Sequence, residues 1–182
     1  MSDFPSTLQY PLHTIHAWSM EALGPFLQSV LATNDLSAQA SATWPSANLA
    51  LYIPFVLVHP VLVVKLWIHN GATASGNVDV GIYDEKGTRL TSAGSTAQSG
   101  TSALQIFDIT DIFIGPGLFY MATSHSSTAG TRFRVALGST VDNKAGGMLQ
   151  QASAHPLPAT ATFATLSNNY VPMFGLSTRV TL

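Results

Sequence analysis

The stretch that decides the fold is residues 61–71, which read VLVVKLWIHNG. Its even positions are all apolar as far as residue 68, whereas Lys65, Trp67 and His69 share the opposite face. Side chains of a β-strand point alternately to its two faces, so this period of two predicts a strand with one buried face. The Asn-Gly pair that closes the stretch is a turn signal and ends the strand.

An apolar run over residues 49–68 contains the first part of this strand and has about the length that a transmembrane helix needs. Pro54 and Pro60 would interrupt a helix, and Lys65 would lie within the span. Val, Ile and aromatic residues, which favour strands, dominate the run. We therefore expect two consecutive core strands with a bend near Pro60, and no membrane insertion.

Strand and turn signals continue along the rest of the chain. Residues 78–83 alternate in the same way, and a tight turn follows at 84–87, where Gly87 suits a positive φ. Further strands are expected at 89–93, 104–109, 118–124, 132–137 and 176–182. About seven to nine short strands separated by turns are typical of a sandwich or jelly roll, not of a parallel α/β sheet.

The predicted fold class is therefore all-β: a jelly-roll-like antiparallel β-sandwich over residues 48–182, preceded by an irregular N-terminal arm over residues 1–47. Apolar residues of the segment 20–33 recur at helix-like spacing, and Pro25 fits the first turn of one short helix. Residues 34–47 are rich in Ala, Ser and Thr and are expected to form a linker. The exposed apolar side chains of such an arm are stable only when packed on another surface. The assembly or docking residues that we expect in the arm are Phe4, Tyr10, Trp18, Phe26 and Leu27.

The composition favours a protein that is buried against other proteins. Charged residues make up only 9% of the chain, against about 25% in a typical soluble domain. A net charge of −2 gives no electrostatic footprint for nucleic acid or an anionic membrane. The absence of cysteine excludes disulfides, zinc-thiolate sites and thiol catalysis.

Catalytic and metal-binding motifs find little support. The chain has no Gly-x-Ser-x-Gly elbow and no phosphate loop, and its nine acidic residues form no recognisable glycosidase pair. His13 and His16 form a single pair without further metal ligands. Asp79 and Asp84 are either calcium ligands or, as we favour, solvated or turn-capping carboxylates. The sequence therefore predicts neither an enzyme nor a cofactor.

Six side chains on three strands are candidate ligand or interface residues. They are Lys65, Trp67 and His69 on one strand, Arg132 and Arg134 on another, and Tyr83 on a third. An aromatic ring beside hydrogen-bonding groups can stack on a sugar ring. Aromatic residues and Arg are also enriched in subunit interfaces. We favour the interface, or burial of Trp67 beneath the arm, and keep the sugar site as the alternative.

Residues 77–100 read NVDVGIYDEKGTRLTSAGSTAQSG and resemble a module found in structural proteins of tailed bacteriophages, in tail, fibre or capsid-associated proteins. The resemblance continues through residues 102–105 and 116–122 and extends back to 52–55, so that it covers about half of the chain. It implies a β-sandwich virion component, similar in architecture to carbohydrate-binding jelly rolls.

The function expected from these observations is that of a non-enzymatic phage structural protein located in the virion. It would form a homo-oligomer, a trimer or a ring, and dock onto other phage structural proteins as a capsid decoration, fibre or tail component. The alternative is a host-receptor or carbohydrate-binding module that binds a surface glycan through Trp67 and Tyr83.

Overall fold

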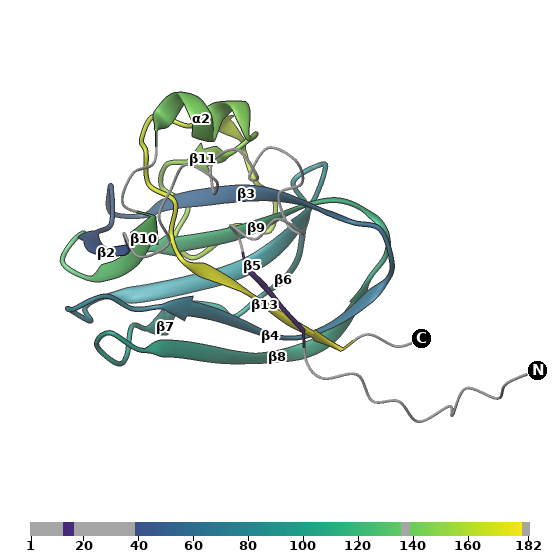
Figure 1. Cartoon of the computed structure of the whole chain (residues 1–182), viewed down its shortest axis with the longest axis horizontal. Helices are drawn as coiled ribbons and strands as arrows, with labels where there is room; N and C mark the ends of the chain where they lie inside the picture. Colours follow the sequence, from purple (N-terminus) through teal and green to yellow (C-terminus); the bar gives the residue numbers. More distant parts are fainter. Residues whose placement is uncertain (1–12, 17–38, 136–138, 180–182) are drawn as a thin grey trace, which may run out of the picture.

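A computed structural model describes residues 13–16, 39–135 and 139–179. These residues form an antiparallel β-sandwich with one short helix, α2 (Thr140–Ala145), which confirms the predicted fold class (Figure 1). None of the helices in the described part of the chain is long and apolar enough to cross a membrane.

The sandwich consists of two large sheets and one small sheet. The four-stranded sheet has the order β1 (His13–His16), β13 (Phe174–Arg179), β4 (Val61–His69), β8 (Leu104–Ile114). The seven-stranded sheet has the order β12 (Ala164–Thr165), β11 (Leu149–Gln151), β3 (Leu49–Leu57), β9 (Gly117–His125), β5 (Asn77–Asp84), β6 (Arg89–Ser92), with β7 (Thr96–Ala97) also paired to β5. The two-stranded sheet contains β10 (Thr131–Val135) and β2 (Gln39–Thr43).

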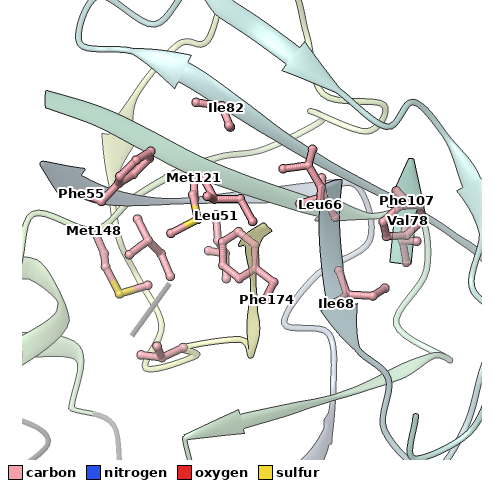
Figure 2. Close-up of a cluster of buried hydrophobic side chains, with 14 of the residues drawn as sticks. Leu51, Phe55, Leu66, Ile68, Val78, Ile82, Phe107, Met121, Met148 and Phe174 are labelled. Atoms are coloured by element: carbon pink, nitrogen blue, oxygen red, sulfur yellow. The ribbon is translucent and has the colours of Figure 1, made fainter. Parts of the chain in front are cut away.

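The hydrophobic core lies between the two large sheets. Alternate residues of β3, β5 and β13 point into it, as the period of two requires. Its members include Leu51, Ile53, Phe55, Val78, Val80, Ile82, Phe174 and Leu176, which are between 0% and 1% exposed. Figure 2 shows part of this cluster, with Met121 and Phe174 close to Leu51. Burial of this apolar surface is the main force that holds the sheets face to face.

The apolar run at residues 49–68 forms two strands, β3 and β4, as expected. The inward face of β4 changes along the strand because its pairing with β13 contains a β-bulge. The consecutive residues Ser177 and Thr178 pair with Lys65 and Val63, which leaves Val64 as the extra residue on β4. The core therefore contains Val61 and Val63 before this β-bulge and Leu66 and Ile68 after it. The prediction that all the even positions point inward is wrong for the first half of the strand, because a bulge shifts the alternation by one residue.

Two segments of the predicted arm pair with strands of the sandwich. β1 pairs with β13, and β2 pairs with β10 along its whole length. In β2 polar side chains alternate with the small Ala40 and Ala42, a pattern with too little apolar surface to specify a strand by itself, so pairing with β10 decides its conformation. The helix expected at residues 20–33 lies outside the described residues. Helix α2 falls in a stretch without a clear pattern, and Ser139 caps its first turn by accepting from the amide of Val141.

The outer face of the seven-stranded sheet is closed by residues 152–163, which we call the covering segment. Its buried Leu157 packs with Tyr52 and Tyr83 in a second apolar cluster. Polar bonds fix it as well: the amide of Leu157 donates to Asp79 Oδ2 (3.0 Å), and the hydroxyl of Tyr83 donates to the carbonyl of Pro158 (2.6 Å). The part of this face around Tyr52 and Tyr83 is therefore covered within the chain.

Candidate functional site

Three of the predicted face residues lie on β4, on the outer side of the four-stranded sheet. The ammonium group of Lys65 lies 3.8 Å from a carboxylate oxygen of Asp108 on β8. Trp67 is only 5% exposed, and the ring of His69 packs on that of Phe133 with their centroids 4.4 Å apart. The structure therefore places these side chains on one face, as the alternation predicts, but it leaves little of the Trp67 ring open to a ligand.

Tyr83 and Arg132 are both fully buried, and their assignment to an accessible ligand or interface face is wrong. Tyr83 does point to the outer side of its sheet, but the covering segment lies over it. Arg132 points inward from β10 instead of outward. Because Trp67 and Tyr83 are both buried in this structure, neither presents a free ring face on which a sugar could stack.

The two arginines of β10 share one face, as predicted, and both stack on aromatic rings. The guanidinium carbon of Arg132 lies 4.8 Å from the ring centroid of Trp44, and that of Arg134 lies 5.4 Å from Tyr170. The two rings are themselves in edge-to-face contact at 5.2 Å. This arrangement offers cation–π stabilisation to both guanidinium groups.

Arg132 belongs to a buried polar cluster at one end of the sandwich, which we define as Asn70, Gln98, His125 and Arg132. All four side chains are at most 7% exposed. Gln98 is its centre. The Nε2 atom donates to Asn70 Oδ1 (2.9 Å) and to the carbonyl of Thr131 (2.8 Å), and Oε1 accepts from the amide of Ser75 (3.0 Å). Buried polar groups are stable only when they are hydrogen-bonded, and Gln98 uses both ends of its amide.

The hydrogen bonds of His125 define a neutral ring with one tautomer. Its Nδ1 atom accepts from the amide of Ser127 (3.0 Å), so Nε2 carries the proton and donates to Gln98 Oε1 (3.1 Å). Burial and the nearby charge of Arg132 lower the pKa of His125 to about 4. The imidazole therefore stays uncharged at neutral pH.

Arg132 is held by neutral acceptors. Its guanidinium group donates to the hydroxyl of Thr123 and to the carbonyl of Ser124 (3.0 Å). Burial lowers its pKa to about 10, so the group remains charged at neutral pH. The described residues contain no carboxylate in ion-pair contact with it. The cluster can orient loops and specify which strands meet at this end, but it is closed to a substrate.

Exposed large apolar side chains are a second feature of the described residues that bears on function. Three of them lie on β8: Leu104 and Ile106 are each 59% exposed, and Phe113 is 64% exposed. The remaining large ones are Val56, Val58, Leu118 and Val141. Sequence reasoning predicted a strand at 104–109 but assigned no exposed residues to it. The available signal was that Leu104 and Ile106 alternate with Phe107 and Ile109, so both faces are apolar and only one can be buried.

Strand β8 lies at the end of the four-stranded sheet, and no described strand pairs with its second side. Edge strands of this kind present unpaired amide and carbonyl groups, which makes them templates for another strand. Natural edges are commonly blocked by Lys or Pro. Between Leu104 and Asp108 the only charged residue is Asp108 itself.

The remaining predictions concern metals and the arm. No group of three or more metal-binding side chains occurs within the described ranges. Asp79 binds the covering segment, and Asp84 caps its turn by accepting from the amides of Lys86 (2.9 Å) and Thr88 (2.7 Å). His13 and His16 lie on β1. The predicted arm residues Phe4, Tyr10, Trp18, Phe26 and Leu27 lie outside the described residues.

Comparison with known proteins identifies no family. No family model matches the chain. No curated protein matches it either. Among solved structures, the infectious bursal disease virus VP2 subviral particle is similar at 11% identity over 93% of this chain, with a TM-score of 0.34. The structure of the Gx strain of the same virus gives 9% identity over 93% of this chain, with a TM-score of 0.31. The chain spans 40% of the length of each of these structures, and TM-scores this low carry no argument about its role.

Proposed function

We propose that this protein is a non-enzymatic structural component of a virus particle, which acts by self-association and by docking onto other virion proteins. One observation carries the proposal. The buried polar groups are engaged in holding the fold, whereas large apolar side chains are exposed on the edge strand β8. A surface of that kind suits burial against protein, and the low content of charged residues points the same way.

The resemblance of residues 77–100 to tailed-bacteriophage structural proteins supports the finer proposal of a phage tail, fibre or capsid-decorating component. The glycines of this stretch have scaffold roles: Gly87, with a φ of +85°, completes the turn between β5 and β6. The resemblance therefore indicates the fold, and the proposed role rests on the exposed apolar residues.

The test is the mass of the full chain in solution, measured by light scattering over a wide range of concentration. We expect a defined homo-oligomer. A matched variant lacking residues 1–12 keeps β1 and β2, the two described strands of the arm, so it examines the first part of the arm separately from them. Mass spectrometry of purified particles then tests the virion location. A chain that stays monomeric at every concentration and is absent from particles contradicts the proposal.

A further inference from the structure

We propose that the second side of β8 pairs with β8 of another copy of this chain, antiparallel around a two-fold axis at Ile106. The two four-stranded sheets would then form one continuous sheet. This inference rests on the proposed self-association and names the surface that would carry it. It follows from the backbone directions, the exposed side chains and the regular length of β8.

The backbone directions come from two hydrogen bonds of β4. The amide of His69 donates to Met173 (3.0 Å), at the start of β13, and the amide of Asn70 donates to Ala103 (2.9 Å), next to β8. Successive residues of a strand point their amides in opposite directions. Odd residues of β4 therefore face β13, and the pairs Trp67↔Ile106 and Lys65↔Asp108 have no direct hydrogen bonds between them.

It follows that the residues of β8 in those pairs direct their amide and carbonyl groups away from β4. Leu104, Ile106 and Asp108 thus present a row of donors and acceptors along the free side of the edge strand. Water satisfies such a row in an isolated chain, and the partner that matches its spacing is an extended strand. This geometry favours a β-strand as the occupant over a helix or a small molecule.

The side chains of the same residues make the surface apolar. Leu104 and Ile106 are both 59% exposed, and Ile106 lies opposite the buried Trp67 on β4. Pairing through Ile106 would place the two copies of this side chain directly opposite each other, with the Trp67 rings on either side. The joined sheet would thus bury a continuous apolar row across its centre.

The register follows from where β8 is regular. Ser102 has a φ of +50°, which ends the extended chain before Leu104. After Asp108 the pairing with β4 becomes irregular, since Val63 pairs with Ile112 while Lys65 pairs with Asp108. The regular segment is therefore 104–108, and antiparallel self-pairing over its full length centres on Ile106. A register centred on Asp108 would instead oppose two like charges, which is destabilising.

The absence of cysteine from the chain provides a direct test. In the variant Ile106→Cys, the two thiols would lie opposite each other in a hydrogen-bonded pair. Their Cα separation of about 5.5 Å falls within the range of disulfides. Mild oxidation should therefore give a disulfide-linked dimer on a non-reducing gel. Leu104→Cys and Asp108→Cys should each fail to cross-link alone but should form a mixed dimer when combined.

A second variant tests self-association without a cross-link. Proline at position 106 removes only an amide that points away from β4, so the ladder within the chain keeps its bonds. We expect Ile106→Pro to weaken self-association at least about tenfold, which is the effect of 1.4 kcal/mol, with little change in the thermal midpoint. The matched control is Phe113→Ser, because Phe113 is similarly exposed on β8 but lies outside the regular segment.

The outcomes separate this inference from the proposed function. If the chain self-associates but Ile106→Cys forms no dimer, the contact lies on another surface and the inference fails alone. Self-cross-linking of Leu104→Cys would also overturn the register. If the unmodified chain is monomeric at every concentration, the inference and the proposed function fail together. The cysteine variants give an answer even if Ile106→Pro does not fold.

Discussion

The buried polar cluster and the free side of β8 differ in where their polar and apolar groups lie: the cluster buries polar side chains, and β8 exposes apolar ones. At the cluster, Gln98 and Arg132 lie inside the protein with their hydrogen bonds made within the chain. On β8, Leu104 and Ile106 face outward, and the backbone beside them has no described partner strand. The hydrogen bonds of the cluster form within a single copy, whereas the free side of β8 can still pair with another strand. Substitutions in the first region should therefore alter stability, and those in the second should alter association.

The largest effect is expected for Gln98→Ala. The substitution leaves the Oδ1 atom of Asn70, the amide of Ser75 and the Nε2 atom of His125 without their partner. Each orphaned buried group costs roughly 1–3 kcal/mol, so we expect a loss of about 3 kcal/mol in the free energy of unfolding. Denaturant titration measures it.

Gln150→Ala is the matched control, because the bonds of Gln150 to Ser167 are exposed and water can replace them. We expect it to cost less than about 1 kcal/mol. Equal losses for the two variants would show that removing a hydrogen-bonding side chain from the polar cluster costs no more stability than removing one at the surface.

Gly130→Ala should give the next largest loss. A Cβ atom at this position would lie 2.5 Å from the carbonyl oxygen of Ser75 and 2.6 Å from Nε2 of His125. Overpacking of this kind costs about 2 kcal/mol. Nothing lies within 4 Å of a Cβ atom at Gly115, so Gly115→Ala should change stability by less than about 0.5 kcal/mol. Calorimetry of both variants tests the contrast, which fails if Gly130→Ala is as stable as the parent.

The protonation of His125 predicts a pH dependence. Its pKa in the folded state is lowered to about 4 by burial and by the charge of Arg132, whereas the unfolded chain has the ordinary value of 6.5. Between these two values the unfolded state binds more protons, so stability falls as the pH is lowered through this window. Burial also lowers the pKa of the neighbouring His155, which acts in the same direction.

Asp79 acts in the opposite direction, because burial raises its pKa and the folded state then binds the additional proton. The test therefore compares the pH dependence of a variant with that of the parent chain, in which Asp79 contributes equally. The thermal midpoint of His125→Gln should depend less steeply on pH between about 4 and 6.5 than that of the parent chain. Parallel curves for the two proteins would refute the role assigned to His125.

The smallest effect on stability is expected on β8. Leu104→Ser removes a side chain that is 59% exposed. Exposed substitutions away from special features usually change stability by less than about 0.5 kcal/mol. We expect that result at a concentration where the protein is monomeric, together with weaker self-association at high concentration. A loss of stability comparable to that of Gln98→Ala would remove the distinction between the two regions.

The sequence predicts those parts of the fold in which alternation and turn chemistry act locally. Strand β4 has the expected bounds, and the turn after β5 uses Asp84 and Gly87 as expected. It does not predict the bulge in β4 or the pairing of β2, because both depend on a partner strand far away in the chain. Local pattern therefore identifies strands better than it identifies their faces.

The buried polar cluster shows the same limit. In β10 the alternation of Arg132 and Arg134 with Phe133 favours the apolar side as the inner one. The structure instead buries Arg132 and packs the half-buried Phe133 on His69. Arg132 is tolerated inside because Trp44 offers a ring face and β9 offers oxygen acceptors. These groups meet only in the folded chain, so no spacing in the sequence reveals them.

The position of β13 has a consequence for the order in which the sandwich can form. This strand, near the end of the chain, lies between β1 and β4 and brings the fully buried Phe174 and Leu176 into the core. During synthesis, β4 and β8 are made long before this inner strand exists. The growing chain must therefore keep one side of β4 unpaired until residue 179 has been added, and that unfinished edge is prone to pairing with other chains. The sandwich is thus expected to close as a unit, late and from its C-terminal strand.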